Sequence, residues 1–95
     1  VGYVDDERFA TARAAALAGR GWGDAGIRHD LEGHALAQEV VSAALDGLTP
    51  ESERAAELAA RLGRTPKTAA QLARKGFGED ALGAAFGEQI ADAGL

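Results

Sequence analysis

The chain has 95 residues, contains no cysteine and carries a formal net charge of −5 at pH 7. This length fits one small domain or two small units, and without cysteine neither disulfides nor thiolate zinc sites can form. The acidic balance argues against binding DNA by net charge alone, and because no apolar run of about 18 residues and no secretory leader is present, we expect a cytoplasmic protein without a membrane partner.

The first helix is predicted to begin near Asp5, because the acidic residues 5–7 can cap its free N–H groups and complement the helix dipole. Three glycines within segment 19–23 favour a turn and end the helix there. The side chains that form an apolar face at helical spacing, and that we expect in the core, are Phe9, Ala12, Ala16 and Leu17.

A second helix is predicted over residues 24–32, with Ile27 and Leu31 one turn apart on its apolar face. A third is predicted over residues 37–46, where apolar residues again recur at helical spacing. The residues on that face, extended into the following loop, are Val40, Val41, Ala44, Leu45 and Leu48. Because no segment alternates polar and apolar residues as a half-buried strand does, the chain is predicted to be entirely helical.

Two Thr-Pro pairs, at 49–50 and 65–66, are predicted to start a fourth and a fifth helix, with threonine as the N-cap and proline at the first helical position. Gly63 is expected to end the fourth helix, and a turn at 76–78 separates the fifth from a sixth. The expected core-facing residues of these three helices are Ala55, Leu58, Ala59, Leu62, Ala69, Leu72, Ala73, Leu82, Ala85, Phe86 and Ile90.

Segments 27–45 and 68–86 carry one apolar pattern twice, 41 positions apart. The matched pairs are Ile27 and Thr68, Leu31 and Leu72, Leu36 and Phe77, Val41 and Leu82, Ala44 and Ala85, and Leu45 and Phe86. A fixed-period repeat indicates tandem supersecondary units. We predict an elongated all-α fold of two three-helix units, residues 1–48 and 49–95, with six short helices in right-angled, helix-turn-helix-like packing. Repeat proteins usually act through binding surfaces and not through one catalytic centre.

Two patterns that could support nucleotide or carboxylate chemistry have simpler interpretations. The spacing of Gly21, Gly23 and Gly26 matches a dinucleotide-binding fingerprint, but a helix precedes it in place of the required strand. A flexible turn between helices, with Trp22 packed over it, is therefore the favoured interpretation. The acidic residues 5–7 are explained by a helix N-terminus, so they need no role in acid–base or magnesium chemistry.

Neither a metal site nor a catalytic centre is predicted. His29 and His34 lie five positions apart, which on a helix turns their side chains about 140° away from each other. Two such ligands without cysteine or a third partner make a poor metal site. Ser42 and Ser52 lie in ordinary helical positions without a matched histidine. We therefore predict a non-enzymatic protein without cofactor or metal.

Segment 61–75 contains five basic residues and no acidic one, namely Arg61, Arg64, Lys67, Arg74 and Lys75. One interpretation is a solvated face in which cations lie near helix C-termini. The other is contact with an anionic surface, either nucleic acid phosphate or an acidic protein groove. Trp22 has two interpretations as well, as a core residue or as an interface residue.

Several motifs, taken in order, resemble those of the RecX family of bacterial regulators of the RecA recombinase. Residues 3–10 resemble the family's aliphatic-Asp-Asp-x-Arg-Phe-Ala stretch, and residues 20–23 its Arg-Gly-aromatic-Gly segment. Residues 27–31 resemble the helix that follows, and residues 72–77 resemble the Leu-x-Arg-Arg/Lys-Gly-Phe of the third repeat. Residues 33–37 depart from the family's basic-Gly-aliphatic turn and leave its geometry open. The matches cover nearly the whole chain.

The resemblance implies tandem three-helix repeats, normally three, of which this chain would hold the second and third. It implies a regulator that binds RecA filaments along their helical groove and restrains recombinase, ATPase and co-protease activity in DNA repair, recombination and the SOS response. Single- or double-stranded DNA is a candidate second partner, although this chain is more acidic than most members of the family. No small-molecule substrate is implied.

The exposed basic and aromatic positions predicted to contact a partner are Arg20, Trp22, Arg28, Arg64, Lys67, Arg74 and Lys75. Two alternatives to a RecA regulator are kept. One is a stand-alone helical nucleic-acid-binding module, which the basic segment 61–75 would support. The other is a generic protein-interaction module, which would leave the order of the motifs unexplained.

Overall fold

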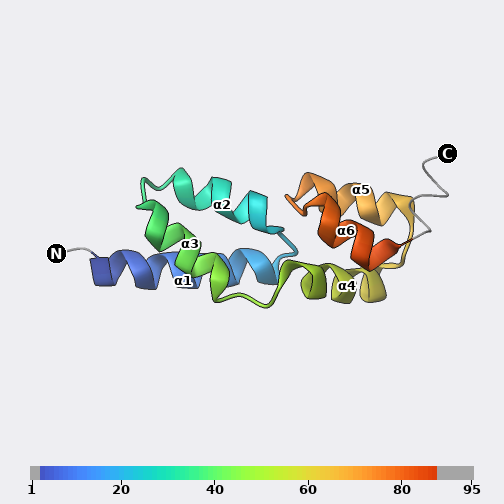
Figure 1. Ribbon diagram of the computed structural model, residues 1–95, viewed down its shortest axis with the longest axis horizontal. Helices are drawn as coiled ribbons and strands as arrows, with labels where there is room; N and C mark the ends of the chain where they lie inside the picture. Colours follow the sequence, from blue (N-terminus) through green and yellow to red (C-terminus); the bar gives the residue numbers. More distant parts are fainter. Residues whose placement is uncertain (1–2, 88–95) are drawn as a thin grey trace.

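The computed structural model describes residues 3–87 of the chain, and within them it contains six α-helices and no strand. The helices are α1 (Tyr3–Gly19), α2 (Asp24–Glu32), α3 (Gln38–Asp46), α4 (Glu51–Leu62), α5 (Pro66–Arg74) and α6 (Glu79–Phe86), as Figure 1 shows. The prediction of an all-α fold with six short helices is confirmed. α2 has the predicted bounds, whereas α1 begins at Tyr3, before the predicted Asp5.

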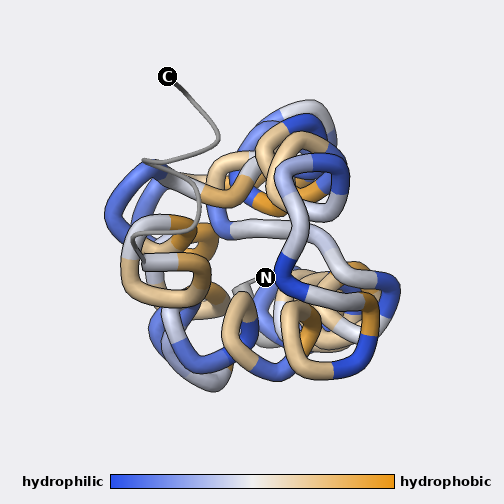
Figure 2. The backbone as a smooth tube through the Cα atoms, turned by 90° about the vertical axis from the view of Figure 1, so that its right-hand side faces the viewer, coloured by the Kyte–Doolittle hydropathy of each residue, from blue (hydrophilic) through white to orange (hydrophobic). Residues whose placement is uncertain are grey.

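The molecule is elongated, with principal extents of 52, 21 and 16 Å. α1, α2 and α3 form one end, α4, α5 and α6 form the other, and the chain crosses once between them after α3 (Figure 1). In the end-on view of Figure 2, hydrophilic and hydrophobic stretches alternate along the backbone, as expected for amphipathic helices that bury one face. The tandem arrangement of two sets of three helices is therefore confirmed.

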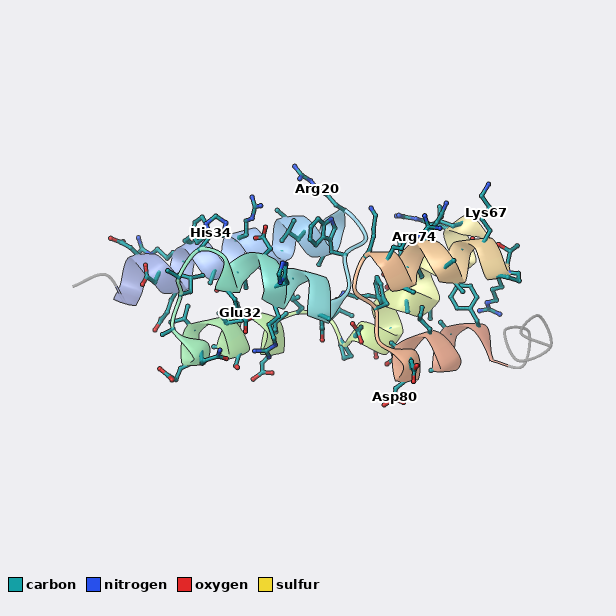
Figure 3. All side chains as sticks on the ribbon, turned by 90° about the horizontal axis from the view of Figure 1, so that it is seen from above. Arg20, Glu32, His34, Lys67, Arg74 and Asp80 are labelled. Carbon is teal, nitrogen blue, oxygen red and sulfur yellow. The ribbon has the colours of Figure 1, made fainter. Side chains whose placement is uncertain are left out.

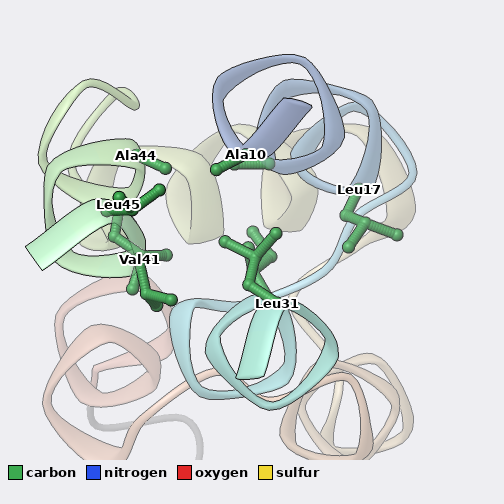
Figure 4. Close-up of a cluster of buried hydrophobic side chains, with 9 residues drawn as sticks. Ala10, Leu17, Leu31, Val41, Ala44 and Leu45 are labelled. Atoms are coloured by element: carbon green, nitrogen blue, oxygen red, sulfur yellow. The ribbon is translucent and has the colours of Figure 1, made fainter. Parts of the chain in front are cut away.

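Each set of three helices encloses its own hydrophobic core. The first core, shown in Figure 4, consists of Ala10, Ala14, Leu17, Ile27, Leu31, Val40, Val41, Ala44 and Leu45. The second consists of Ala55, Ala59, Ala69, Leu72, Phe77, Ala81, Ala85 and Phe86. Thr68, the counterpart of Ile27, is buried too, and Leu36 and Leu82 are partly buried against the two cores. The matched positions of the 41-residue repeat thus form equivalent parts of two cores.

The predicted apolar face of α1 is wrong except at Leu17. The residues that were expected inside but are exposed are Phe9, Ala12 and Ala16. Ala10 and Ala14 are fully buried in their place, because their small side chains let α1 approach α2 and α3 closely. The ring of Phe9 packs edge-on against His34, with 5.0 Å between the ring centroids. α1 carries alanines on several of its sides, so hydrophobicity alone could not show which side of the helix faces the core.

The two Thr-Pro pairs begin their helices in different ways. Thr65 is the N-cap of α5, and its side-chain oxygen accepts a hydrogen bond from the backbone N–H of Thr68, as predicted. At α4 the N-cap is Pro50, so the prediction of Thr49 as the cap is wrong. The carbonyl oxygen of Thr49 instead accepts a hydrogen bond from the guanidinium of Arg54. This difference makes the start of α4 part of the junction between the two cores.

Two further residues that were predicted to face the core lie on the surface. Leu62, the last residue of α4, is 54% exposed and does not pack against the second core. Ala73 is exposed, because α5 buries the neighbouring face that carries Ala69 and Leu72. Ile90 lies outside the described residues. Among the described residues, Leu62 and Ala73 are therefore the predicted core residues that the second core lacks, and one leucine is left at the surface.

The two cores are joined by direct backbone contact between the start of α2 and the end of α5. The N–H of Gly23 donates to the carbonyl oxygen of Lys75 at 2.8 Å, and the N–H of Ala25 donates to that of Gly76 at 3.1 Å. A Cβ atom at Gly23, Gly26 or Gly76 would overlap backbone atoms across this contact. The glycines at 23 and 26 therefore permit close approach of two chain segments, which makes the turn a packed joint and not a flexible one.

Arg54 of α4 is the polar centre of the same junction and is only 8% exposed. Its guanidinium donates to the carbonyl oxygens of Thr49, at 2.7 Å, and Trp22, at 3.3 Å. It also forms an ion pair with Asp24 at 2.8 Å. These contacts fix the start of α4, the loop before α2 and the first residue of α2 to one another.

Glu51 connects two helix N-termini at this junction. Its carboxylate accepts a hydrogen bond from the N–H of Asp24, at 2.7 Å, and from the N–H of Gly78, at 3.4 Å. These N–H groups lie at the starts of α2 and α6, where a carboxylate is favoured by the positive end of each helix dipole. One side chain of α4 therefore caps a helix from each core.

Candidate interaction surface

A groove of about 550 Å³ lies where the end of α1 meets α4 and α5. We call it the basic groove and define it by six of the residues that line it, namely Arg20, Leu58, Arg61, Leu62, Arg74 and Lys75. Three of these, Arg20, Arg74 and Lys75, were predicted from the sequence to contact a partner. Arg20 comes from the turn after α1, whereas Arg74 and Lys75 end α5, so the junction brings residues of both units together.

The position of Lys75 follows from the turn in which it lies. Lys75 is the C-cap of α5, and the next residue, Gly76, adopts a positive φ of 96° that favours glycine. Its ammonium group reaches across to donate a hydrogen bond to the carbonyl oxygen of Arg20 at 3.0 Å. This contact holds the charges of the two units beside one groove.

Trp22 lies beside a second depression of about 410 Å³, which it lines together with His29, Arg74 and Lys75. Its ring is half-buried and packs against the first core. The structure thus gives Trp22 a packing contact and a partly accessible surface. The turn at Arg74 and Lys75 separates this depression from the basic groove and lines both.

The remaining predicted contact residues, Arg28, Arg64 and Lys67, do not line the basic groove. Lys67, Gln71 and Arg74 follow one another at helical spacing on one side of α5. Figure 3 shows Arg20, Arg74 and Lys67 along one long edge of the molecule, while Asp80 lies on the opposite edge. Arg64 is exposed in the connection between α4 and α5. Lys67 therefore extends the basic edge beyond the groove.

Arg28 is not part of this surface. It is half-buried on α2 and lines a separate depression with Asp24, Asp46 and Glu51. Three carboxylates in its neighbourhood make this depression unsuited to an anionic partner. Sequence reasoning placed Arg28 with the other cations because charge alone does not show on which side of the molecule a helix presents it.

Arg61, Leu58 and Leu62 were missing from the predicted contact residues, although all three line the groove. Arg61 belongs to the basic segment 61–75, which was a signal for it. The leucines were assigned to the core, because a helical spacing shows that residues share a face but not where the covering helices end. Arg54 was not singled out from the sequence either, although the repeat could have indicated it. Arg54 lies 41 positions after Arg13, and both arginines bind an aspartate.

The cations of the basic groove keep their charge uncompensated within residues 3–87. In that range the ion pairs join Arg13 and His34 to Asp30 and join Arg54 to Asp24. None of them involves a groove residue, and no carboxylate lines the groove. A chain with a net charge of −5 therefore carries a local surface of positive charge, which favours an anionic partner.

The shortest ion pair of the first unit, among the described residues, joins α1 to α2. The guanidinium of Arg13 donates two hydrogen bonds to the carboxylate of Asp30, at 2.8 and 2.9 Å. These hydrogen bonds are the main reason why the pKa of Asp30 lies below its usual value, whereas burial of the carboxylate raises it. Attraction to Arg13, His34 and His29 lowers that pKa further. This pair is structural and lies away from the basic groove.

Residues 3–87 contain no group of three His, Cys, Asp or Glu side chains placed to hold a metal ion. Over the same part of the chain, no helix is both long enough and apolar enough to cross a membrane. The arrangement that these residues do provide is a grooved, positively charged surface at a rigid joint between two helical units.

Comparison with known proteins gives two consistent results. A family model described as RecX, second three-helix domain, matches residues 5–45, the part of the chain that contains the first core. The chain is also similar to the regulatory protein RecX of Xanthomonas axonopodis pv. citri (strain 306) and to that of Xanthomonas citri. Each is 37% identical over 94 aligned residues, which cover 88% of this chain and 58% of the relative. No solved structure matches this chain.

Proposed function

The chain belongs to the RecX family of regulatory proteins, and from this premise we propose that it binds RecA nucleoprotein filaments. Binding would lower the recombinase, ATPase and co-protease activities of RecA in DNA repair and the SOS response, in the cytoplasm and without catalysis by this chain. Because the chain spans 58% of the length of the relatives it matches, the proposal concerns its share of a regulator's activity.

The observation that carries the proposal is the convergence of Arg20, Arg74 and Lys75 on one groove at the joint of an elongated array. A nucleoprotein filament presents a repeating surface, and an elongated protein can touch more than one of its subunits. Several modest contacts on a rigid support then add up to useful affinity. The joint provides that rigidity, since it is made of backbone hydrogen bonds and the buried Arg54.

We further propose that the chain consists of two structural units, residues 1–48 and 49–95. The two cores and the positions of α3 and α4 support a boundary between Asp46 and Glu51. In this proposal each unit is a scaffold, and the residues that differ between the two units determine specificity. The basic segment 61–75 occurs in the second unit alone.

The proposal is tested by measuring ATP hydrolysis by RecA on single-stranded DNA with increasing amounts of this chain. We expect hydrolysis to fall and the chain to sediment together with the filaments. A preparation of the chain that is unfolded by heat and not refolded serves as the control. Unchanged hydrolysis together with no co-sedimentation would refute the proposed function.

A stand-alone nucleic-acid-binding module is a second candidate because five cations lie between residues 61 and 75. In that case the chain would bind naked DNA, and its affinity would fall steeply with salt as phosphate contacts release counterions. Co-sedimentation of the chain with DNA, measured with and without RecA, separates the two functions. Binding to naked DNA that equals binding to the filament would favour the second candidate.

A further inference from the structure

The basic groove has an apolar floor that ends in an exposed leucine. Leu72, which is buried, and Leu58, which is half-buried, form part of its lining. Leu62 stands at its edge with 54% of its surface exposed, compared with 43% for Phe9, the other exposed large hydrophobic residue among those whose side chains the structure describes. Phe9 packs on His34, whereas Leu62 has no place in the second core. The groove therefore offers accessible apolar surface next to its positive charges.

Charge surrounds this apolar floor on more than one side. Arg61 lies next to Leu62 on α4, Arg74 and Lys75 come from the end of α5, and Arg20 comes from the turn after α1. Among residues 3–87, no carboxylate lines the groove. A surface that is apolar at its centre and cationic at its rim is complementary to a ligand that is apolar at its centre and anionic at its rim.

We propose that the basic groove binds an acidic segment of a partner protein through one or two large aliphatic side chains that pack on Leu62 and Leu58. Carboxylates beside those side chains pair with Arg61 and Arg74. This inference names the chemistry of the segment that the proposed filament contact would use, so it rests on the proposed function.

The composition of the groove favours such a segment over nucleic acid. Single-stranded nucleic acid is held by aromatic side chains on which its bases stack, as well as by cations. The groove offers leucines, while Trp22 lines the separate depression beyond Arg74 and Lys75. Phosphate groups would gain nothing from Leu62. A dependence of binding on Leu62 therefore distinguishes the two partners.

A second copy of this chain is also a poor occupant. In a two-fold symmetric dimer the same patch meets itself, so the cations of one groove would face those of the other. Like charges held face to face oppose association. An acidic segment of another protein avoids this repulsion and neutralises the rim.

The test uses a short fluorescein-labelled peptide in which leucines at helical spacing are flanked by glutamates. Its control peptide has serines in place of the leucines and the same charge. Fluorescence anisotropy measures the binding of each to the full chain. We expect the leucine peptide to bind at least about tenfold more tightly than the control, since a buried aliphatic contact is commonly worth that much at an interface.

Matched variants assign the binding to the groove. Leu62→Ser should weaken binding of the leucine peptide about tenfold, whereas Phe9→Ser, at an exposed large hydrophobic residue outside the groove, should leave it unchanged. The double variant Arg61→Glu and Arg74→Glu should abolish binding, whereas Arg8→Glu, on the surface of α1, should not. Circular dichroism checks that each variant remains folded.

Four outcomes would overturn the inference. One is equal affinity for the two peptides, and a second is a Leu62→Ser variant that binds the leucine peptide like the original chain. A third is tighter binding to an oligothymidylate than to the leucine peptide, and a fourth is self-association in analytical ultracentrifugation that Leu62→Ser removes. Co-sedimentation with RecA filaments is measured on the same variants. If Leu62→Ser retains full filament binding, the apolar contact is wrong but the proposed function stands.

Discussion

The backbone N–H of Gly23 donates a hydrogen bond to the carbonyl oxygen of Lys75 at 2.8 Å, although 52 positions separate them in the chain. This contact seats the start of α2 on the end of α5 and leaves no space for a side chain between them. The loop with Arg20 and Trp22 and the turn with Arg74 and Lys75 are consequently held beside each other. The surface proposed to bind a partner is therefore a product of the joint.

Gly23→Ala should lower the free energy of unfolding by about 1–3 kcal/mol, because the added methyl group would overlap the backbone of Gly76 and Phe77. Gly19→Ala is the matched control, since a Cβ atom there has no neighbour within 4 Å. That substitution should be neutral or stabilising by up to about 1 kcal/mol. Urea unfolding followed by circular dichroism gives both values, and equal stability of the two variants would contradict the joint.

Arg54→Met should destabilise the protein by about 2–3 kcal/mol, because three hydrogen bonds of a buried cation are lost and the carbonyl oxygens of Thr49 and Trp22 lose their donor. Arg8→Met, on the exposed side of α1, should change stability by less than about 0.5 kcal/mol. Urea midpoints compare the two. A loss at Arg54 no greater than that at Arg8 would show that the junction does not depend on this side chain.

Ala35→Gly should stabilise the protein by about 0.5 kcal/mol. Ala35 has a φ of 59°, a left-handed conformation that costs alanine about 1 kcal/mol or more. Glycine relieves this strain, but part of the stabilisation is lost because glycine makes the unfolded chain more flexible. Its counterpart in the second repeat, 41 positions on, is Gly76 with a φ of 96°. Ala60→Gly, on the exposed side of α4, should instead cost about 1 kcal/mol. Thermal unfolding of both variants gives the signs, and destabilisation by Ala35→Gly would contradict the backbone geometry.

The link between Arg13 and Asp30 predicts a dependence of stability on pH. The pKa of Asp30 is lower in the folded protein, so its ionisation stabilises the fold at any pH above its usual value of 3.8. That contribution is lost as the pH falls through the lowered folded-state pKa. Urea unfolding at several pH values should show Asp30→Asn to be less stable than the original chain near neutral pH. The gap should close in acid, and a gap that is constant with pH would rule out this titration.

The sequence predicted the helices better than it predicted their rotations. The bounds of α2 and the cap at Thr65 follow from local signals, namely glycines at a turn and a threonine before proline. The 41-residue repeat located both cores, since buried apolar spacing is a property of each helix. The rotation of α1 could not be read, because alanines occur on all its sides and the packing surface is chosen by helices that come later in the chain.

The candidate surface was predictable only in part for the same reason. The basic segment 61–75 pointed to Arg74 and Lys75, but their proximity to Arg20 depends on glycine contacts between distant segments. Arg28 looked equivalent to them in sequence and lies among carboxylates in space. The spacing of Leu62 predicted a core residue, but Leu62 is exposed. The sequence of one helix does not show how far the helices that cover it extend.

The most direct measurement of the central claim is the inhibition of RecA by a double variant, Arg74→Glu and Lys75→Glu, compared with the original chain and with Arg8→Glu. ATP hydrolysis on single-stranded DNA and co-sedimentation with filaments are recorded at equal concentrations of folded protein. We predict that the original chain and Arg8→Glu inhibit and sediment alike, while the double variant loses most of both activities. Full inhibition by the double variant would contradict the claim that the basic groove forms the contact with the filament.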